Sequence, residues 1–273
     1  MKVVLITGAS SGIGKACASH LHHKGYRVYG TSRLAMDPNV APAAADDGGF
    51  RLLPMDVTDE ASIAKAIEYV EQIEGRLDVL VNNAGYGLAG TVEDTMTTEA
   101  HLQLDTNFLG TVRVCRAVIP LMRRQGSGLI VNISSMAGVV GIPFQSFYSA
   151  SKFAVEGFSQ ALRGEIGAYG ISVVVIRPGD LKTSFTVNRK KIPPPEGSPN
   201  TRAFETALEI MEQDEANGPS PETVAKRLGQ LIASKSPPLC TTVGSASQRF
   251  LISLRLILPI SLFERALRAY YRL

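Results

Sequence analysis

Short apolar runs, most of them followed by a helix-like segment, recur along the first two thirds of the chain. The first run, residues 3–6, contains only valine, leucine and isoleucine, which is typical of a strand buried on both faces. Helical periodicity follows at residues 12–24, and Gly25 is suited to end that helix. Alternation of buried strands with helices predicts an α/β fold, a single-domain Rossmann-type doubly wound parallel sheet with helices on both faces.

The same rhythm continues as far as Pro178. Further strands are predicted at residues 27–31, 50–55, 78–81, 128–133 and 171–176. Further helices are predicted at residues 60–74 (capped by Asp59), 98–124 and 147–169, and an exposed loop at residues 34–49.

The rhythm breaks after Pro178. Residues 180–200 include three consecutive prolines and several charges, so we expect a mobile excursion there. Helices at 201–216 and 221–234 and a last strand at 239–243 follow. We therefore predict one domain over residues 1–246 and a helical extension, apolar and basic, over residues 247–273.

Composition narrows the class of protein. The net charge is only +3, which gives no reason to expect a nucleic-acid partner. Cys17, Cys115 and Cys240 lie far apart, without metal-ligand or redox spacing, and indicate buried, reduced thiols in a cytoplasmic protein without a metal. The first strand begins at Lys2, which leaves no room for a signal peptide, and no apolar stretch reaches the length of a membrane span.

A glycine-rich turn joins the first strand to the first helix. It has the spacing G-x-x-x-G-x-G from Gly8 to Gly14, and it opens directly into the helix. Glycines permit a tight turn, and free N–H groups at a helix start attract a pyrophosphate. Gly8 to Gly12 also match the G-x-S-x-G elbow of serine hydrolases, but only seven residues precede Gly8, too few for an upstream oxyanion loop.

A tyrosine and a lysine stand four residues apart in the predicted helix at 147–169. Tyr148 and Lys152 therefore share one face of that helix. An ammonium beside a phenol favours the phenolate, so we expect Lys152 to lower the pKa of Tyr148 and to suit it for proton exchange with a hydroxyl or carbonyl.

Together these features resemble the short-chain dehydrogenase/reductase family. The resemblance covers residues 1 to about 185 and rests on six motifs in order: Thr7 to Gly14, Asn82-Asn83-Ala84-Gly85, Asn107, Ser134-Ser135, Tyr148-x-x-x-Lys152 and Pro178-Gly179. Within the family, the chain looks like the branch of 17β-hydroxysteroid and retinol dehydrogenases and bacterial ketone reductases. The resemblance implies an oxidoreductase that interconverts a carbonyl and an alcohol, and a homodimer or homotetramer.

The family's catalytic roles map onto four residues. Tyr148 would be the acid in reduction and the base in oxidation, and Lys152 would hold the nicotinamide ribose. Ser135, thirteen residues before Tyr148, is preferred to Ser134 as the group that stabilises the substrate oxygen. Asn107 would kink its helix and hold a water in a proton relay. A non-catalytic NADP(H)-binding or redox-sensing module is the alternative, although such a module needs only the cofactor contacts.

The expected cofactor is NADP(H). Arg33 stands near the end of the second strand, where an enzyme that selects NAD carries a carboxylate, and the first carboxylate after it is Asp37. The resemblance implies cofactor contacts at Thr7, Gly8, Ser10, Ser11, Gly12, Ile13, Gly14, Arg33, Asp56, Val57, Asn83, Ala84, Gly85, Tyr148, Lys152, Pro178, Gly179 and Thr183.

The substrate end is predicted to be apolar, with a substrate loop at about residues 180–220. Its residues are Met136, Val140, Ile142, Pro143, Phe144, Phe147, Phe185 and Val187, and no Arg or Lys cluster suggests an anionic handle. We expect a bulky apolar carbonyl or alcohol, such as a steroid, a retinoid, or a fatty or aromatic ketone or aldehyde. The tail at 247–273 is apolar with arginines and tyrosines, and its two interpretations are a lid or subunit interface, and peripheral contact with a membrane.

Overall fold

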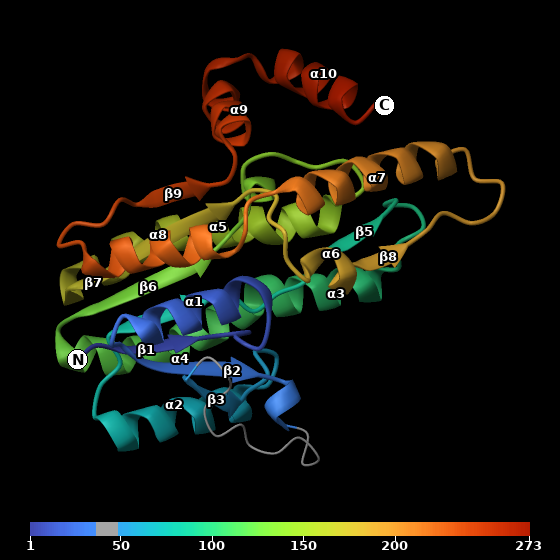
Figure 1. Cartoon of the computed structure of the whole chain (residues 1–273). Helices are drawn as coiled ribbons and strands as arrows, with labels where there is room; N and C mark the ends of the chain where they lie inside the picture. The colour runs from blue at the N-terminus through green and yellow to red at the C-terminus, as the bar shows by residue number, and fades with distance from the viewer. Residues whose placement is uncertain (37–48) are drawn as a thin grey trace.

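The computed structural model describes residues 1–36 and 49–273. Its centre is a seven-stranded parallel sheet of order β3-β2-β1-β4-β6-β7-β9, seen in Figure 1. The strands are β1 (Val3–Ile6), β2 (Arg27–Ser32), β3 (Arg51–Pro54), β4 (Val79–Asn82), β6 (Gly128–Ile133), β7 (Ile171–Pro178) and β9 (Cys240–Val243). The predicted doubly wound parallel sheet is confirmed.

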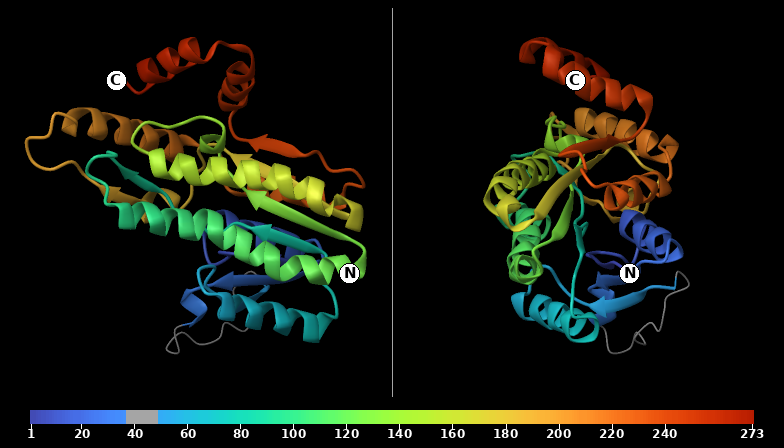
Figure 2. Two further views of the ribbon diagram at one scale, coloured as in Figure 1. Left: turned by 180° about the vertical axis from the view of Figure 1, so that it is seen from behind. Right: turned by 90° about the vertical axis from the view of Figure 1, so that its left-hand side faces the viewer.

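Helices cover both faces of this sheet (Figure 2). The α-helices of the described residues are α1 (Gly12–His23), α2 (Glu60–Glu74), α3 (Thr97–Leu104), α4 (Gly110–Gln125), α5 (Ser146–Ile166), α6 (Phe185–Asn188), α7 (Thr201–Asn217), α8 (Glu222–Ala233), α9 (Ala246–Ile257) and α10 (Ile260–Tyr270). Residues of α1 and α8 share one core with the sheet, and residues of α2, α4 and α5 share the other. Burial on both faces explains why the strands carry no polar alternation: Leu5 and Ile6 of β1 are fully buried, and each contributes about 2 kcal/mol.

The predicted helix at residues 98–124 is present, but it has an interruption. A π-helical turn at Asp105–Leu109 separates α3 from α4 and contains Asn107, the residue at which a kink was predicted. A π turn frequently marks a functional position in a helix. The predicted loop at residues 34–49 lies mostly outside the described residues, and Leu34–Met36 forms a 3₁₀ turn.

The predicted mobile excursion at residues 180–200 is wrong for its central part. It contains α6 and the short strand β8 (Lys190–Ile192), which pairs in parallel with β5 (Leu88–Gly90). This second, two-stranded sheet ties the segment after β7 to the loop that follows β4.

The C-terminal extension forms the helices α9 and α10, which lie across one end of the body at the top of Figure 1. Ile252 and Phe263 pack with Val140, and Tyr271 packs with Ala207 and Met211 of α7. Among residues 1–36 and 49–273, no helix has both the length and the apolarity needed to cross a bilayer.

The exposure of each cysteine depends on its position in the fold. Cys17 and Cys115 are buried, as predicted, and burial raises the pKa of both thiols to about 12. Cys240 is exposed, contrary to the prediction, because it begins β9 at the edge of the sheet.

Candidate active site

The glycine-rich turn is fixed to the loop that follows β4. Thr7 Oγ1 accepts hydrogen bonds from the backbone N–H groups of Asn83 and Ala84, each at 2.9 Å. The Asn83 side-chain amide donates to the carbonyl oxygens of Thr7, at 2.9 Å, and of Gly8, at 3.0 Å. Asn83 therefore shapes the turn with its side chain, and the two loops form one rigid rim at the carboxyl end of the central strands.

Two glycines of the turn cannot be replaced without movement. A Cβ atom on Gly14 would lie 2.2 Å from the carbonyl oxygen of Gly8, and one on Gly8 would lie 2.9 Å from Cα of Ala84. Gly8 also has a φ of +65°, in the left-handed region that glycine adopts readily. The close approach of backbone to backbone is what these glycines make possible.

The start of α1 fits an anion. Ser11 is its N-cap but makes no side-chain capping bond, and the first turn contains no acidic residue. Unbonded N–H groups and the helix dipole together favour a negative group at this end. Ser10, Ser11, Gly12, Ile13 and Gly14 surround this position, which is where a dinucleotide pyrophosphate would be held.

The residues predicted to hold the adenosine half lie at the same edge of the sheet. The N–H of Ala9 donates to the carbonyl oxygen of Thr31 at 2.9 Å, so the end of β2 adjoins the turn, and exposed Arg33 follows it. Asp37 lies outside the described residues. The Asp56 carboxylate accepts two bonds from Thr58, each at 2.8 Å.

Two further predicted cofactor contacts, Val57 and Gly85, are closely packed against other residues. The Val57 side chain is buried against Gly110, where a Cβ atom would lie 2.7 Å from Val57 Cγ2. Gly85 lies against the Asn107 side chain, and a Cβ atom there would lie 2.9 Å from Asn107 Oδ1. Both residues can meet a cofactor only through their backbone atoms.

Tyr148, Lys152 and Ser135 come together beside the end of β6. Tyr148 is 7% exposed and Lys152 is 6% exposed, and the Lys152 ammonium lies 5.8 Å from the centroid of the Tyr148 ring. The Lys152 ammonium donates to the carbonyl oxygen of Ile133 at 3.0 Å. Ser135 is hydrogen-bonded to the Tyr148 phenol, whereas Ser134 Oγ is buried and has no hydrogen-bond partner among the described residues.

The expectation that the pKa of Tyr148 falls below its usual value is wrong for this structure. Burial raises the pKa of Tyr148 to about 12, and the opposing effects come from the hydrogen bond to Ser135 and the charge of Arg189. Burial also lowers the pKa of Lys152 to about 8. The phenol is therefore held in its protonated form across the physiological range, as a proton donor must be.

Asn107 is buried in the π turn, and its side-chain amide is fully engaged. Its Oδ1 accepts from the N–H of Tyr86 at 3.0 Å, and its Nδ2 donates to the Tyr86 carbonyl oxygen at 3.0 Å and to Ser151 Oγ at 3.2 Å. Ser151 in turn donates to the carbonyl oxygen of Tyr148 at 2.7 Å. Asn107 thus connects the loop after β4 to the helix that carries Tyr148.

The segment after β7 closes the site from the opposite side. Pro178 ends β7, and the N–H of Gly179 donates to the carbonyl oxygen of Val243 at 2.8 Å. Thr183 lies over the glycine-rich turn, since a Cβ atom on Gly12 would be 3.8 Å from Thr183 Cβ. The structure therefore brings the glycine-rich turn and the segment after β7 together.

Charged residues that the sequence reasoning did not predict lie beside Tyr148. The ring of Phe185 is 5.6 Å from the ring of Tyr148, between centroids, and the guanidinium of Arg189 lies 5.6 Å from the same Phe185 ring. Arg189 pairs with Glu215 in the protein interior. In the sequence, Arg189 and Glu215 stand among other charged residues that look exposed, so nothing indicated that these two side chains are buried.

The part of the chain that carries these motifs matches a known protein family. Residues 2–193 match the family model described as short chain dehydrogenase. The chain is 43% identical over 272 residues to the 3-ketodihydrosphingosine reductase of Bacteroides thetaiotaomicron, which covers 99% of this chain and 98% of that protein. It is 36% identical over 253 residues to the retinol dehydrogenase 8 of Bos taurus, which covers 87% and 80%.

Solved structures share the fold over nearly the whole chain. A short-chain dehydrogenase from Streptomyces avermitilis has a TM-score of 0.79 at 31% identity and covers 100% of this chain and 97% of that one. The structure of ElxO with NADP bound has a TM-score of 0.71 at 28% identity and covers 89% and 96%.

Proposed function

The chain belongs to the short-chain dehydrogenase/reductase family, in the branch that resembles retinol and steroid dehydrogenases, and we propose that it is an NADP(H)-dependent oxidoreductase. It interconverts a carbonyl and an alcohol on a bulky apolar substrate. The observation that carries this proposal is the grouping of buried Tyr148 and Lys152 with partly buried Ser135, in which a protonated phenol interacts with a serine hydroxyl beside an ammonium.

In the direction of reduction, a nicotinamide held at this site would supply the hydride that the carbonyl carbon accepts. Tyr148 donates its phenolic proton to the carbonyl oxygen, and the Ser135 hydroxyl stabilises the negative charge that develops on that oxygen. Lys152, 5.8 Å from the ring, stabilises the phenolate that Tyr148 becomes. Oxidation runs the same steps in reverse, with the phenolate as base.

Proton return to Tyr148 is assigned to Lys152 and Asn107. Lys152 has a pKa of about 8, so its ammonium can release a proton near neutral pH. The Asn107 side chain keeps the π turn in place through Tyr86 and Ser151. Its backbone carbonyl oxygen is the group we assign to the relay water.

The preference for NADP(H) rests on Arg33. Arg33 is exposed and follows β2, where the resemblance to the family places the adenosine ribose, and a planar guanidinium suits a 2′-phosphate. The NADP-bound ElxO structure, which shares the fold at 28% identity, supports the same cofactor.

The substrate is proposed to be an elongated apolar ketone or aldehyde. Met136, Val140 and Ile142 pack against residues of α9 and α10, so the C-terminal helices form a lid over the predicted apolar end. The names of the relatives point to 3-ketodihydrosphingosine and retinoids as the compounds to test first.

The C-terminal helices also support peripheral contact with an anionic membrane. Phe250, Ile257 and Ile260 are 67%, 78% and 56% exposed, and residues 247–273 contain five arginines against one glutamate. Apolar side chains flanked by arginine suit the interface of a bilayer.

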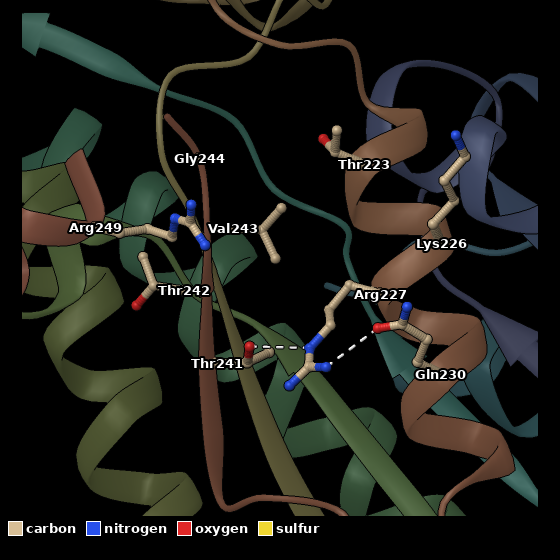
Figure 3. A pocket seen from close by; sticks show the side chains of 9 residues that line it. All are labelled: Thr223, Lys226, Arg227, Gln230, Thr241, Thr242, Val243, Gly244 and Arg249. Carbon is tan, nitrogen blue, oxygen red and sulfur yellow. Dashed lines mark hydrogen bonds between the residues drawn. The ribbon is translucent and has the colours of Figure 1, made fainter. Parts of the chain in front are cut away.

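A basic groove lies at the root of these helices (Figure 3). It measures about 470 Å³ and is lined by Lys226, Arg227 and Arg249 together with Thr223, Gln230, Thr241, Thr242, Val243 and Gly244. Arg227 donates to Thr241 at 3.0 Å and to Gln230 at 3.2 Å. Because Arg249 is next to Phe250 on the exposed side of α9, the groove can take a lipid phosphate while the apolar residues enter the bilayer.

Sedimentation with vesicles tests this contact. The variant with Phe250, Ile257 and Ile260 each changed to Ser should lose binding to phosphatidylglycerol vesicles, and Val92→Ser, on an exposed apolar residue outside the tail, should keep it. Equal sedimentation of the triple variant would refute the membrane proposal. Size-exclusion chromatography with light scattering on the same samples tests the proposed homodimer or homotetramer.

The enzymatic proposal is tested by oxidation of NADPH with 3-ketodihydrosphingosine, retinal, steroid ketones, and fatty and aromatic carbonyls. Tyr148→Phe should lower turnover by about 10²–10⁴-fold and retain NADPH binding, because the change removes only the proton donor. Tyr26→Phe, on a partly buried tyrosine between α1 and β2, is the matched control and should retain turnover. Full activity of Tyr148→Phe would refute the assigned role, and NADPH binding without turnover on any carbonyl would favour the non-catalytic module.

A further inference from the structure

Four charged side chains lie at the substrate end, where the sequence predicted apolar residues. Asp180 follows β7, Arg189 stands between α6 and β8, and Asp214 and Glu215 lie near the end of α7. Arg189 is 4% exposed and Glu215 is 7% exposed, so their charges are held in the interior. Burial of ionised groups costs free energy unless they are well paired, so a buried charge that is not fully paired indicates a functional role.

These groups are close enough to act on one another. Glu215 accepts from Nη2 of Arg189 and, at 2.5 Å, from Thr186 Oγ1. Burial, with the charges of Asp214 and Glu215, raises the pKa of Asp180 to about 6, and the charge of Arg189 opposes that rise. The four side chains therefore form one electrostatic cluster.

The cluster adjoins the reacting tyrosine. The ring of Phe185 lies 5.6 Å from the ring of Tyr148 and 5.6 Å from the guanidinium of Arg189. The charges of Arg189, Glu215 and Asp180 all act on the pKa of Tyr148. On the side of the lid, Asp180, Asp214 and Glu215 act on the pKa of Tyr271. The cluster thus lies between the proton donor and the C-terminal lid.

Negative charge is in excess within the cluster. Three carboxylates face one guanidinium, and that guanidinium pairs with Glu215. Asp180 accepts from the neutral side-chain amide of Gln248, and Asp214 accepts from the neutral hydroxyl of Tyr270, each at 2.5 Å. Such a cluster attracts a cation and repels a carboxylate or phosphate.

Part of the Arg189 guanidinium lacks a hydrogen-bond partner among the described residues. Its side chain is fully buried, and its Nε and Nη1 atoms have no hydrogen-bond partner among the described residues. Buried donors are nearly always paired, so two unpaired ones beside a reactive site indicate an acceptor oxygen that arrives with a ligand.

We propose that Asp180, Arg189, Asp214 and Glu215 form a subsite that recognises a protonated amine and a neighbouring oxygen on the substrate. The carboxylates of Asp180 and Asp214 bind the ammonium, and the free N–H groups of Arg189 bind the oxygen. This inference rests on the proposed function for the position of the reacting carbonyl at Tyr148. It narrows the substrates to amino-substituted carbonyl compounds, or the matching amino alcohols, on an apolar chain.

The charge preference can be measured without turnover. Isothermal titration calorimetry on the full chain, with NADPH and without it, would compare octylamine, 1-octanol and octanoate, which share one chain and differ in the charge of the head group. We expect octylamine to bind at least tenfold more tightly than 1-octanol, and octanoate to bind most weakly.

Two isosteric variants locate the preference. Asp180→Asn and Asp214→Asn each remove a charge and leave an amide oxygen to accept from Gln248 or Tyr270, so the packing is kept. The double variant should lose the preference for octylamine over 1-octanol. Glu74→Gln is the matched control, since this carboxylate is 15% exposed and bonded to Tyr29, and it should keep the full preference.

The outcomes separate the two proposals. Equal binding of octylamine and 1-octanol to the unmodified chain, with reduction of an apolar ketone intact, overturns the subsite and leaves the enzyme in place. A preference that survives in the double variant also overturns the subsite. A preference lost in the double variant, in a chain that reduces no carbonyl, supports the subsite and counts against the proposed function alone.

Discussion

The aromatic ring of Phe185 rests against the ring of Tyr148, with 5.6 Å between the centroids and 56° between the planes. Phe185 belongs to α6, which follows β7, whereas Tyr148 belongs to α5. Tyr148 is therefore covered by a residue from the segment after β7, and that cover contributes to the burial that raises the pKa of its phenol.

Removal of this ring should lower the pKa of Tyr148. In Phe185→Ala, water reaches the phenol, and the phenolate becomes easier to form. Reductive kcat/KM needs the protonated phenol, so the alkaline fall that Tyr148 causes, which lies above the fall at the pKa of Lys152, should begin at lower pH than in the unmodified enzyme. Phe153→Ala, on a half-exposed ring of α5, is the control and should leave the profile in place. An unshifted profile for Phe185→Ala would contradict the argument.

Lys152 should govern the pH dependence near neutrality. Its pKa is lowered to about 8, so its ammonium loses a proton as the pH rises through that value, while Tyr148 stays protonated to about 12. Reductive kcat/KM should therefore decline near pH 8. In Lys152→Arg the charge persists at all accessible pH values, so activity should be lower but free of this decline. The same decline in Lys152→Arg would assign it to another group, and Lys65→Arg on exposed α2 should behave as the unmodified enzyme.

Arg33 should set the choice between the two nicotinamide cofactors. Arg33→Asp replaces a partner for the 2′-phosphate by a group that repels it and can accept from a ribose hydroxyl. The ratio of kcat/KM with NADPH to that with NADH should fall by about tenfold or more. Lys24→Asp, on an exposed residue after α1, makes the same charge change away from the ribose position. An equal fall in both variants would make the effect one of overall charge.

Gly14 should be intolerant of even one methyl group. A Cβ atom there would lie 2.2 Å from the Gly8 carbonyl oxygen, so Gly14→Ala must displace the turn and should cost roughly 1–3 kcal/mol of unfolding free energy. A methyl group on Gly164, within α5, would meet no described atom within 4 Å beyond the backbone of its own helix, and Gly164→Ala should stabilise the chain by about 0.5–1 kcal/mol. Urea unfolding measures both changes, and equal effects would contradict the close approach.

Much of the fold could be predicted from the sequence because its main elements have local causes. The buried parallel strands are continuous apolar runs, and Asp59 caps α2 by accepting from the N–H of Ala61. The short strands β5 and β8 were not predicted, since three residues are too few to show a period of two and their pairing depends on contacts across the chain.

The candidate site also contains some residues that could be predicted from the sequence and others that could not. The motif residues from Thr7 to Thr183 keep their order along the chain and meet at one edge of the sheet, as expected for a doubly wound fold. Arg189 and Glu215 are separated by 26 positions and look like surface charges in the sequence, so their burial could not be predicted. The pKa of Tyr148 was predicted in the wrong direction because burial by Phe185 and its neighbours is a tertiary property.

The contact of the glycine-rich turn with the segment after β7 has a kinetic consequence. A Cβ atom on Gly12 would lie 3.7 Å from Ser184 Oγ, and Phe185, the next residue, covers Tyr148. One short segment therefore lies over both the glycine-rich turn and Tyr148. The nucleotide should add before the carbonyl compound and leave after the alcohol, so that product-inhibition patterns show a compulsory order of addition.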